Sequence, residues 1–266
     1  MLQHPAFDPV AFKIGPLKVH WYGLMYLIGF VVGWWLGRRR ARESWRGFTP
    51  ESMDDVLFYV VLGVVLGGRV GYVLFYGLDR FLADPLFLFQ IQNGGMSFHG
   101  GLLGVILAMM LFARRRGMRF FQVADFIAPL VPPGLLAGRM GNFINGNLWG
   151  RPTELPWAMV FPKADALGRH PSQLYEALLE GVVLFLIVWL YSRAPRPLGA
   201  VSGMFLVCYA VFRFLVEFVR DHVTLVGYLG IEWLTMGQLL CLPMFAFGVA
   251  LMVRAARHGT IADARG

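Results

Sequence analysis

The sequence consists of apolar blocks of roughly 20 residues, the length that crosses a lipid bilayer as an α-helix, separated by short polar stretches. Hydrophobic residues make up 57% of the 266 positions and charged residues only 15%, with 23 Phe and 8 Trp. A soluble core does not bury that much apolar surface. We therefore predict an all-α polytopic membrane protein that forms one integral domain over residues 1–266. The seven predicted transmembrane helices are 20–37, 56–78, 95–113, 121–140, 172–191, 199–219 and 233–253.

Clusters of arginine set the predicted orientation. Basic runs occupy positions 38–42 after the first span and 114–116 after the third, and Arg193 and Arg196 separate the fifth span from the sixth. Short cytoplasmic loops carry an excess of Lys and Arg. The amino terminus is therefore expected in the periplasm and, with seven spans, the carboxyl terminus in the cytoplasm. These loops also explain the net charge of +8, so the charge is not taken as evidence for nucleic-acid binding.

Residues 142–171 interrupt the apolar pattern. This stretch is polar and rich in turn-forming residues, and its length favours a small periplasmic subdomain between the fourth and fifth spans. Ser172 is expected to cap the fifth span, and Glu176 would lie in its first turn, where an acidic side chain favours the helix dipole. A structural role alone accounts for both residues.

The stretch Gly138–Gly150 is the least compatible with an ordinary membrane helix. It places Arg139 and several amide side chains at the end of a predicted span that already contains prolines at positions 129, 132 and 133. Breaks of this kind persist in membranes where protein or water satisfies the freed backbone groups. The fourth span is therefore expected to line a cavity.

Polar side chains gather in the outer half of the predicted spans, as judged at roughly 1.5 Å of rise per residue. Ionisable residues at this depth are costly and mark functional sites. The chemistry of this protein is therefore expected to face outward. The residues concerned are Arg69, Arg139 and Arg213 late in outward-running spans, Tyr22 and His99 early in inward-running spans, and Asn142, Asn145 and Glu217 at or near the outer surface.

Each of these residues also has a structural interpretation. Arg69 is long enough to snorkel to the headgroups, and Arg213 shares a helix face with Glu217, so the two would form an ion pair whatever their function. His99 would be a hydrogen-bonded core histidine, although the glycines around it leave the ring accessible. Tyr22 would belong to the aromatic belt of the membrane interface.

Several kinds of site are missing from the sequence. It contains no zinc-protease or paired-cysteine motif, no Gly-x-Ser-x-Gly nucleophile and no phosphate-binding glycine loop with its lysine. The expected ligand is anionic and amphiphilic, and neither a metal nor a cofactor is predicted. A lipid or anion transporter is the alternative function, because intramembrane arginines and broken helices also occur along transport pathways. A seven-span receptor-like binding protein is a weaker alternative.

Five separate blocks resemble the bacterial prolipoprotein diacylglyceryl transferases, in the same order along nearly the whole chain. These blocks are His20–Tyr26, Gly94–Gly101, Gly138–Gly150, Arg169–Glu176 and Tyr209–Glu217. The chain departs from the family pattern at Asn147, where the family usually has a glutamate, so no carboxylate role is expected at that position.

The resemblance implies an enzyme of the bacterial inner membrane that needs no cofactor. It would transfer the diacylglyceryl group of phosphatidylglycerol to the lipobox cysteine of a preprolipoprotein signal peptide, forming a thioether and releasing glycerol phosphate. Its partners would be these two substrates and the surrounding membrane lipids, with no nucleic acid.

Roles for the candidate residues follow from this reaction. Arg139 and Arg213 would hold the lipid phosphate, because the planar guanidinium binds such groups at two points. His99 would be the base that removes the thiol proton. Glu217 would orient Arg213. The remaining candidates for substrate binding are Tyr22, Asn142, Asn145, Tyr209, Arg69 and Gly150.

Overall fold

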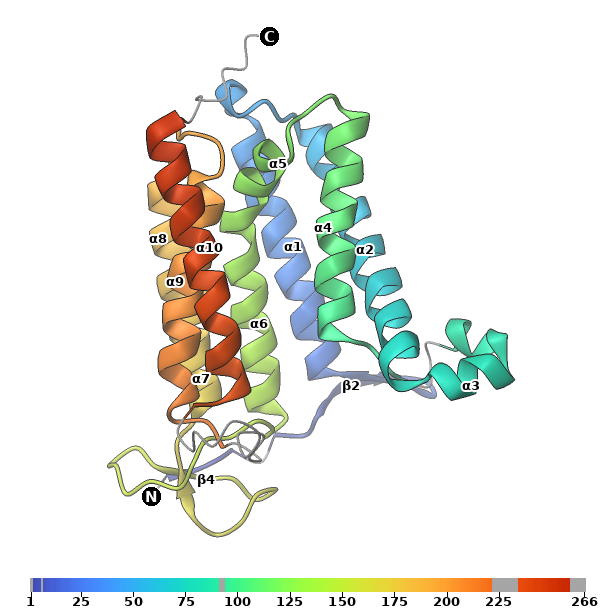
Figure 1. Ribbon diagram of the computed structural model, residues 1–266. Helices are drawn as coiled ribbons and strands as arrows, with labels where there is room; N and C mark the ends of the chain where they lie inside the picture. Colours follow the sequence, from blue (N-terminus) through green and yellow to red (C-terminus); the bar gives the residue numbers. More distant parts are fainter. Residues whose placement is uncertain (1, 6, 91–93, 222–233, 259–266) are drawn as a thin grey trace. The chain divides into compact units, whose positions relative to one another are not determined.

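The computed structural model describes residues 2–5, 7–90, 94–221 and 234–258, and most of these residues are helical (Figure 1). Contacts between Cα atoms divide the chain into two compact units. The described residues of unit 1 fall within 1–36 and 125–258, and unit 2 is built on residues 37–124. The single integral domain stays a prediction.

Unit 2 is built on two long helices, α2 (Pro50–Tyr76) and α4 (Phe98–Arg115), which pack side by side (Figure 1). Glycines of one helix face glycines of the other: a Cβ on Gly63 would lie 2.6 Å from the Gly104 carbonyl oxygen, and one on Gly71 would lie 2.7 Å from Gly100 Cα. Small residues let membrane helices approach closely. Gly100, which directly follows His99 in sequence, therefore serves backbone packing. Shorter helical segments of this unit are η1 (Ser44–Arg46), α3 (Leu78–Ala83) and η2 (Pro85–Phe89).

Unit 1 contains most of the remaining helices. Gly203 and Gly248 bring α9 and α10 close together, because a Cβ on Gly203 would lie 2.8 Å from the Gly248 carbonyl oxygen. The helical segments are α1 (Trp21–Ala41, which continues into unit 2), α5 (Phe120–Ile127, which begins in unit 2), η4 (Ala128–Leu130), α6 (Val131–Ile144), α7 (Ser172–Glu176), the π-helical η5 (Ala177–Val183), α8 (Leu184–Tyr191), α9 (Ala200–Glu217) and α10 (Met236–His258).

Prolines shape the fourth predicted span without ending it. Pro129 lies in the 3₁₀ turn η4, and Pro132 and Pro133 lie in the first turn of α6, where a missing N–H leaves no intrahelical bond unmade. The whole stretch Phe120–Ile144 is long and apolar enough to cross a membrane.

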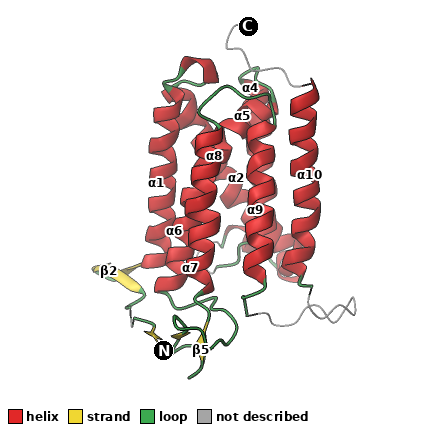
Figure 2. Ribbon diagram, turned by 90° about the vertical axis from the view of Figure 1, so that its left-hand side faces the viewer, coloured by secondary structure: helices red, strands yellow, loops and turns green. Residues whose placement is uncertain are grey.

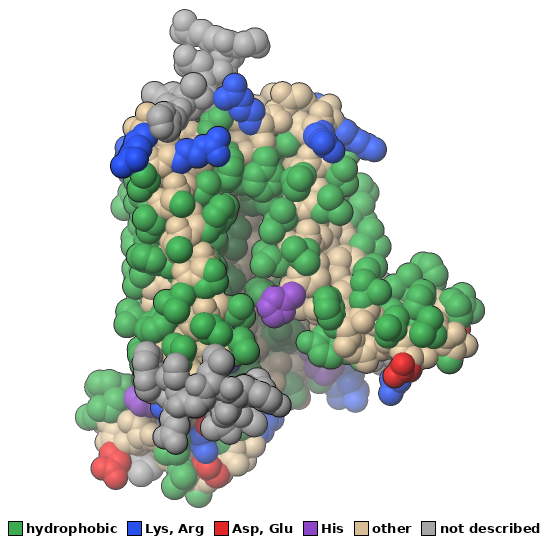
Figure 3. Space-filling view, in the orientation of Figure 1, with side chains coloured by type: hydrophobic (Ala, Val, Ile, Leu, Met, Phe, Trp, Pro, Cys, Tyr) green, Lys and Arg blue, Asp and Glu red, His purple; other side chains and the backbone are tan. Residues whose placement is uncertain are grey.

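Six helical stretches in the described part of the chain have the length and composition of membrane spans, so the protein is a membrane protein. Hydrophobic side chains cover the exposed face of α10, for example Leu240, Leu242 and Phe247 (Figure 3). Within unit 2, Lys and Arg side chains gather where α4 ends. The first predicted span coincides with α1, which is not among the six. The six stretches are Pro50–Tyr76, Phe98–Arg115, Phe120–Ile144, Ser172–Tyr191, Ala200–Glu217 and Met236–Arg257.

Five short strands among the described residues make the all-α prediction incomplete. Three of them form a sheet of order β1-β4-β5 from Leu2–Gln3, Met159–Val160 and Gly168–Arg169, in which β1 is parallel to β4 and β4 is antiparallel to β5. The hairpin of β2 (Val10–Ile14) and β3 (Leu17–His20) turns at Gly15, whose φ of 58° favours glycine.

The sheet lies at the end of unit 1 where α6 ends and α7 begins (Figure 2). It includes two strands of residues 145–171, here called the connecting segment because it joins α6 to α7. His4, just after β1, fixes the end of α6, since its Nε2 hydrogen-bonds the Phe143 carbonyl oxygen at 2.7 Å.

The predicted cap of the fifth span is wrong. The helix begins at Ser172 itself, and Pro171 occupies the N-cap position, where no side-chain cap forms. Ser172 Oγ instead donates to the Leu148 carbonyl oxygen at 2.9 Å, and Gln173 Nε2 donates to the Asn147 carbonyl oxygen at 2.6 Å. The start of this helix therefore holds the end of the Gly138–Gly150 stretch in place.

Candidate functional site

Three arginines and three glutamates of unit 1 meet near the helix ends that adjoin the connecting segment. We call them the Arg/Glu cluster. Its members come from α6, from the continuous helix of α7 and η5, and from α9 with the turn after it: Arg139, Glu176, Glu180, Arg213, Glu217 and Arg220.

Glu176 is the centre of the cluster because it pairs with all three arginines. Its Oε1 lies 2.5 Å from Arg213 Nη1 and 3.5 Å from Arg220 Nη1, and its Oε2 lies 3.3 Å from Arg139 Nε. The predicted helix-dipole role of Glu176 is therefore incomplete, since its carboxylate joins three separate segments of the chain.

The outer members of the cluster extend these pairs. Glu180 Oε2 lies 3.4 Å from Arg139 Nη2, and Glu217 Oε2 lies 2.8 Å from Arg213 Nη2 and 3.5 Å from Arg220 Nη1. The ion pair expected between Arg213 and Glu217 is confirmed. Spacings of three and four residues on one helix produce it, because such positions share a helix face.

The glutamates of the cluster are more deeply buried than its arginines. The side chains of Glu176 and Glu180 are 0% exposed, whereas those of Arg139 and Arg213 keep 18% and 15% of their surface exposed. A buried carboxylate requires a positive partner. The arginine side chains therefore keep part of their surface open, while the buried carboxylates pair with their guanidinium groups, each of which has five N–H donors.

Local sequence explains why these helices approach so closely. A Cβ on Gly181 would lie 2.7 Å from Leu136 Cβ, so glycine at this position lets η5 contact α6. Segments of π-helix are rare and occur frequently at functional sites. Glu180 lies within this segment, which places its carboxylate opposite Arg139.

Tyr22 lies beside the helix that carries Arg139. The Tyr22 ring packs on Gly141, where an added Cβ would lie 3.2 Å from the ring, and its hydroxyl shares a 2.9 Å hydrogen bond with Tyr26. Tyr209 stacks on Phe205 at 5.9 Å between ring centroids. Both tyrosines belong to unit 1, as the cluster does.

The two predicted asparagines lie at the end of α6. The Asn142 carbonyl accepts from Asn147 N at 3.0 Å, and the Asn145 carbonyl accepts from Lys163 Nζ at 2.5 Å. The Asn145 Oδ1 atom is buried, and among the described residues it has no hydrogen-bond partner. An unsatisfied buried acceptor of this kind suits a ligand that brings a hydroxyl.

Gly150 has a packing role. It forms an antiparallel bridge with Arg220, and its N donates to the His170 carbonyl at 2.8 Å. A Cβ here would collide with the Val219 carbonyl oxygen. The glycine is therefore required by close contact between chain segments, although direct substrate contact by Gly150 stays a prediction.

Two candidates lie in unit 2. His99 is the second residue of α4 and is exposed, with its ring in an edge-to-face contact with Phe98 at 5.6 Å between centroids. Arg69 is only 3% exposed, so the snorkelling interpretation is wrong. Its guanidinium donates to the carbonyls of Phe87, Leu88, Gly94 and Gly95. These contacts give Arg69 a structural role and do not favour its predicted contact with substrate.

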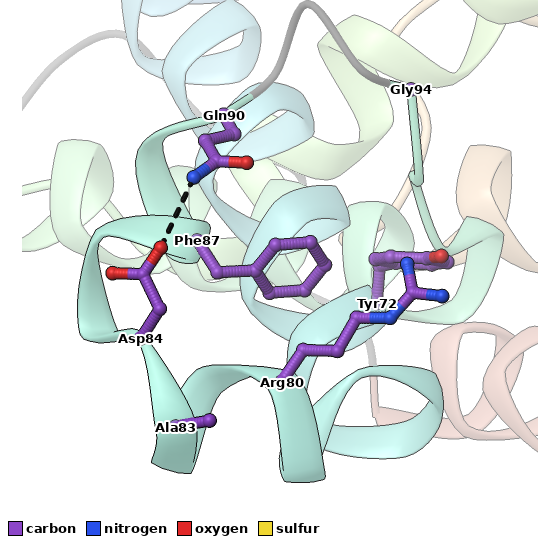
Figure 4. Close-up of a pocket in the computed structure, with 7 residues that line it drawn as sticks. All are labelled: Tyr72, Arg80, Ala83, Asp84, Phe87, Gln90 and Gly94. Carbon is purple, nitrogen blue, oxygen red and sulfur yellow. Dashed lines mark hydrogen bonds between the residues drawn. The ribbon is translucent and has the colours of Figure 1, made fainter.

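Unit 2 also contains a cavity of about 410 Å³, bordered by α2, α3 and η2 (Figure 4). Arg80 and Asp84 are the charged residues among those that line it, and Asp84 is occupied by hydrogen bonds from Leu86 N and Gln90 Nε2. The cavity lacks the multiple arginines that the Arg/Glu cluster offers to an anion.

Comparison with known proteins identifies the family. The family model for prolipoprotein diacylglyceryl transferase matches residues 9–254. The chain belongs to the prolipoprotein diacylglyceryl transferase family. Curated phosphatidylglycerol–prolipoprotein diacylglyceryl transferases are similar over nearly their whole length: 61% identity over 254 residues in Nitratidesulfovibrio vulgaris (96% of each chain), 62% over 258 in Oleidesulfovibrio alaskensis (97% of each), and 59% over 258 in Pseudomonas aeruginosa (97% of each).

The sequence alone did not indicate a site role for three residues of the Arg/Glu cluster: Glu176, Glu180 and Arg220. Glu180 carried a usable signal, because an acid in the middle of a predicted membrane span is itself a functional indicator. Glu176 was explained by its place near a helix start. Arg220 lies one residue beyond the predicted end of the sixth span, where a basic residue is unremarkable.

Proposed function

We propose that this protein transfers the diacylglyceryl group of phosphatidylglycerol to the lipobox cysteine of a preprolipoprotein signal peptide, which is the first step of lipoprotein maturation. One observation carries the proposal: the partly exposed side chains of Arg139 and Arg213 meet at one site, where buried carboxylates hold their guanidinium groups in place. The names of the similar proteins state the same donor and the same class of acceptor.

The phosphate of phosphatidylglycerol is the group that the arginines bind. Both guanidinium groups offer paired N–H donors with the planar geometry that phosphate oxygens accept. As the bond between the glyceryl carbon and the phosphate oxygen breaks, negative charge grows on the departing glycerol phosphate. Donors fixed beforehand by Glu176 and Glu217 stabilise that charge without rearranging.

The cysteine sulfur supplies the electron pair for the new bond. It attacks the glyceryl carbon, a carbon–sulfur bond forms as the carbon–oxygen bond breaks, and the thiol proton leaves to a base. A free thiol has a pKa of about 8.5, so a nearby neutral imidazole assists its ionisation. We assign this role to His99, which is exposed on α4. Neither a metal nor a cofactor takes part in these steps.

The remaining predicted residues would hold the substrates. Asn145 would accept a hydroxyl of the glycerol headgroup at its buried Oδ1. Tyr22, Asn142 and Tyr209 would line the lipid site on unit 1.

The proposed setting is the bacterial inner membrane. Seven helices would span it, with α1 added to the six apolar stretches, and the connecting segment would form a small periplasmic subdomain. The amino terminus would be periplasmic and the carboxyl terminus cytoplasmic. A reporter fused after Gly266 should then be active in the cytoplasm, and one inserted between Arg151 and Gly168 in the periplasm. The opposite pattern of activity would rule out a periplasmic site.

The activity itself is tested with purified protein, phosphatidylglycerol and a synthetic lipobox peptide. We expect a peptide heavier by one diacylglyceryl group and an equal amount of glycerol phosphate, both measured by mass spectrometry. A peptide in which serine replaces the lipobox cysteine is the matched control and should stay unmodified. Movement of labelled lipid across vesicles without lipidated peptide would point to the transporter alternative.

A further inference from the structure

The segment that carries Arg220 is clamped by the connecting segment. Gly150 bridges Arg220 in antiparallel fashion, Arg151 N donates to the Val219 carbonyl at 2.9 Å, and Arg151 Nε donates to the Arg220 carbonyl at 3.0 Å. The main chain at Arg220 is therefore held on the far side from the cluster.

Arg169 extends this clamp to Asp221, the residue after Arg220. Its Nη1 donates to the Gly150 carbonyl at 3.1 Å and pairs with Asp221 at 2.7 Å, while its Nη2 pairs with Asp165 at 2.6 Å. At Gly150 the neighbouring chain segments leave no room for a side chain. A Cβ there would lie 2.7 Å from His170 Cβ and would also collide with the Val219 carbonyl oxygen. Any larger residue must therefore displace a neighbouring segment, and one of these leads directly to Arg220.

The side chain of Arg220 points the other way, into the cluster. Its Nη1 lies 3.5 Å from both Glu176 Oε1 and Glu217 Oε2, and 17% of the side chain is exposed. Burial, and then the neighbouring positive charge of Arg213, lower the pKa of Arg220 below its ordinary value. The position thus costs energy, and the contacts from the connecting segment help to maintain it.

The formal charge of the cluster shows what Arg220 contributes. Three arginines balance three glutamates, so the cluster is neutral as a whole. Without Arg220 the same groups would carry one net negative charge beside the bound phosphate. Glu176 and Glu217 would also attract Arg139 and Arg213 more strongly, which would withdraw their N–H groups from the lipid.

We propose that Arg220 is a positioning residue for lipid binding, held by the connecting segment, and that Gly150 acts on the site through Arg220. The inference rests on the proposed function, because the anion concerned is the phosphate of phosphatidylglycerol. Arg220 compensates Glu176 and Glu217, so that Arg139 and Arg213 remain available to that phosphate.

The test measures KM for phosphatidylglycerol and kcat separately. Arg220→Gln should raise KM roughly ten- to thirtyfold, the effect of one uncompensated charge about 8–12 Å from an anion at an effective dielectric constant near 20, with a smaller change in kcat. Gly150→Ala should show the same split. Arg220→Lys should stay close to wild type, because contacts of 3.5 Å from a single nitrogen require a point charge and not a fork.

Gly134→Ala is the matched control for Gly150→Ala, since a Cβ on Gly134 meets open space. It should bind lipid as wild type does. If Gly150→Ala does not accumulate in the membrane, the KM values of the Arg220 variants test the inference without it.

Charge rescue separates this positioning role from a purely structural one. Lysine restores the positive charge beside Glu176 and Glu217 without restoring the fork, so Arg220→Lys should recover most of the KM that Arg220→Gln loses. Unchanged KM in Arg220→Gln, or an Arg220→Lys variant as weak as Arg220→Gln, would each overturn the inference. Absence of product with the wild-type protein would instead refute the proposed function.

Discussion

Two arginines of this chain occupy the same local sequence and have opposite fates. Arg69 lies in Gly68–Gly71 and Arg139 in Gly138–Gly141, and both stretches read Gly-Arg-x-Gly late in a helix. The guanidinium of Arg69 is enclosed by backbone carbonyls, and the ring of Phe87 lies 4.8 Å from its central carbon. The guanidinium of Arg139 meets two carboxylates and stays partly exposed.

The difference shows which arginines at membrane depth are available for chemistry. Carbonyl groups that accept from every nitrogen of a guanidinium use its donors and fix its position, so Arg69 holds the backbone at residues 87, 88, 94 and 95. Buried carboxylates pair with Arg139 but leave part of its side chain exposed. The motif and its place late in a helix are the same in the two cases, and the partners decide the role.

The largest effect is expected from a substitution that keeps the positive charge of Arg139 and removes its planar guanidinium group. Arg139→Lys should lower turnover by about a hundredfold or more, because loss of one oriented donor from a charge-stabilising site costs about 2–4 kcal/mol. Arg139→Ala should be only slightly worse. Turnover is measured with the phosphatidylglycerol and lipobox assay after membrane levels have been matched. Near-normal activity of the lysine variant would show that a point charge suffices and would move the clamp to Arg213.

His99 extends the comparison to unit 2, where its exposed ring contrasts with the enclosed Arg69. His99→Gln keeps the size and some hydrogen bonding but accepts no proton, so turnover should fall by roughly a hundredfold, with KM for phosphatidylglycerol little changed. Steady-state kinetics with both substrates provide the measurement. Retention of most turnover would reassign His99 to packing and leave the thiol proton to another base.

Periodic and local features of the fold were predictable from sequence, whereas the cluster was largely not. Apolar blocks located six of the seven predicted spans to within about six residues, and the i,i+4 pair of Arg213 and Glu217 is visible on a single helix. Glu176 meets Arg139 from 37 positions away in sequence, and no spacing rule reports such a contact. Without the resemblance to a family, the reaction would also have stayed one of several alternatives.

The failures at the connecting segment have physical causes too. Strands of two residues, such as β4 and β5, are too short for an alternating pattern, so an all-α chain was the natural prediction. Ser172 looked like a cap because serine commonly is one, but its hydroxyl donates to Leu148 across a long-range contact. Backbone carbonyls as partners of Arg69 were equally invisible, since their direction depends on the fold.

Arg69→Lys should affect stability and spare activity, which inverts the result expected at Arg139. An ammonium reaches fewer of the four carbonyls, and each charged hydrogen bond lost costs about 1.5–3 kcal/mol, so the midpoint of unfolding by detergent should fall clearly. Arg80→Lys is the control, because Arg80 is an exposed arginine of the same unit and should tolerate the change. If Arg69→Lys lost turnover without losing stability, Arg69 would rejoin the substrate site.

The smallest effect is expected at a pair between an exposed carboxylate, Asp165, and a largely buried arginine, Arg169. Asp165 accepts two bonds from Arg169, and this hydrogen bonding lowers the pKa of the Asp165 carboxyl. A lowered pKa in the folded state means that the stabilisation is present above the unfolded value near 3.9 and is lost as the pH falls through the folded value.

Asp165→Asn should therefore lower the melting temperature slightly at pH 7, and the gap between variant and wild type should close as the solution is acidified below pH 4. Glu154→Gln, an exposed change in the same connecting segment, should show no gap at either pH. Because surface pairs are screened by solvent, the effect should be the smallest of the four and should shrink further in high salt. A gap that persists in acid would show that the asparagine disturbs the connecting segment itself. Where the gap closes in acid, Asp221 and Gly150 still hold Arg169, and Asp165→Asn should change KM for phosphatidylglycerol little.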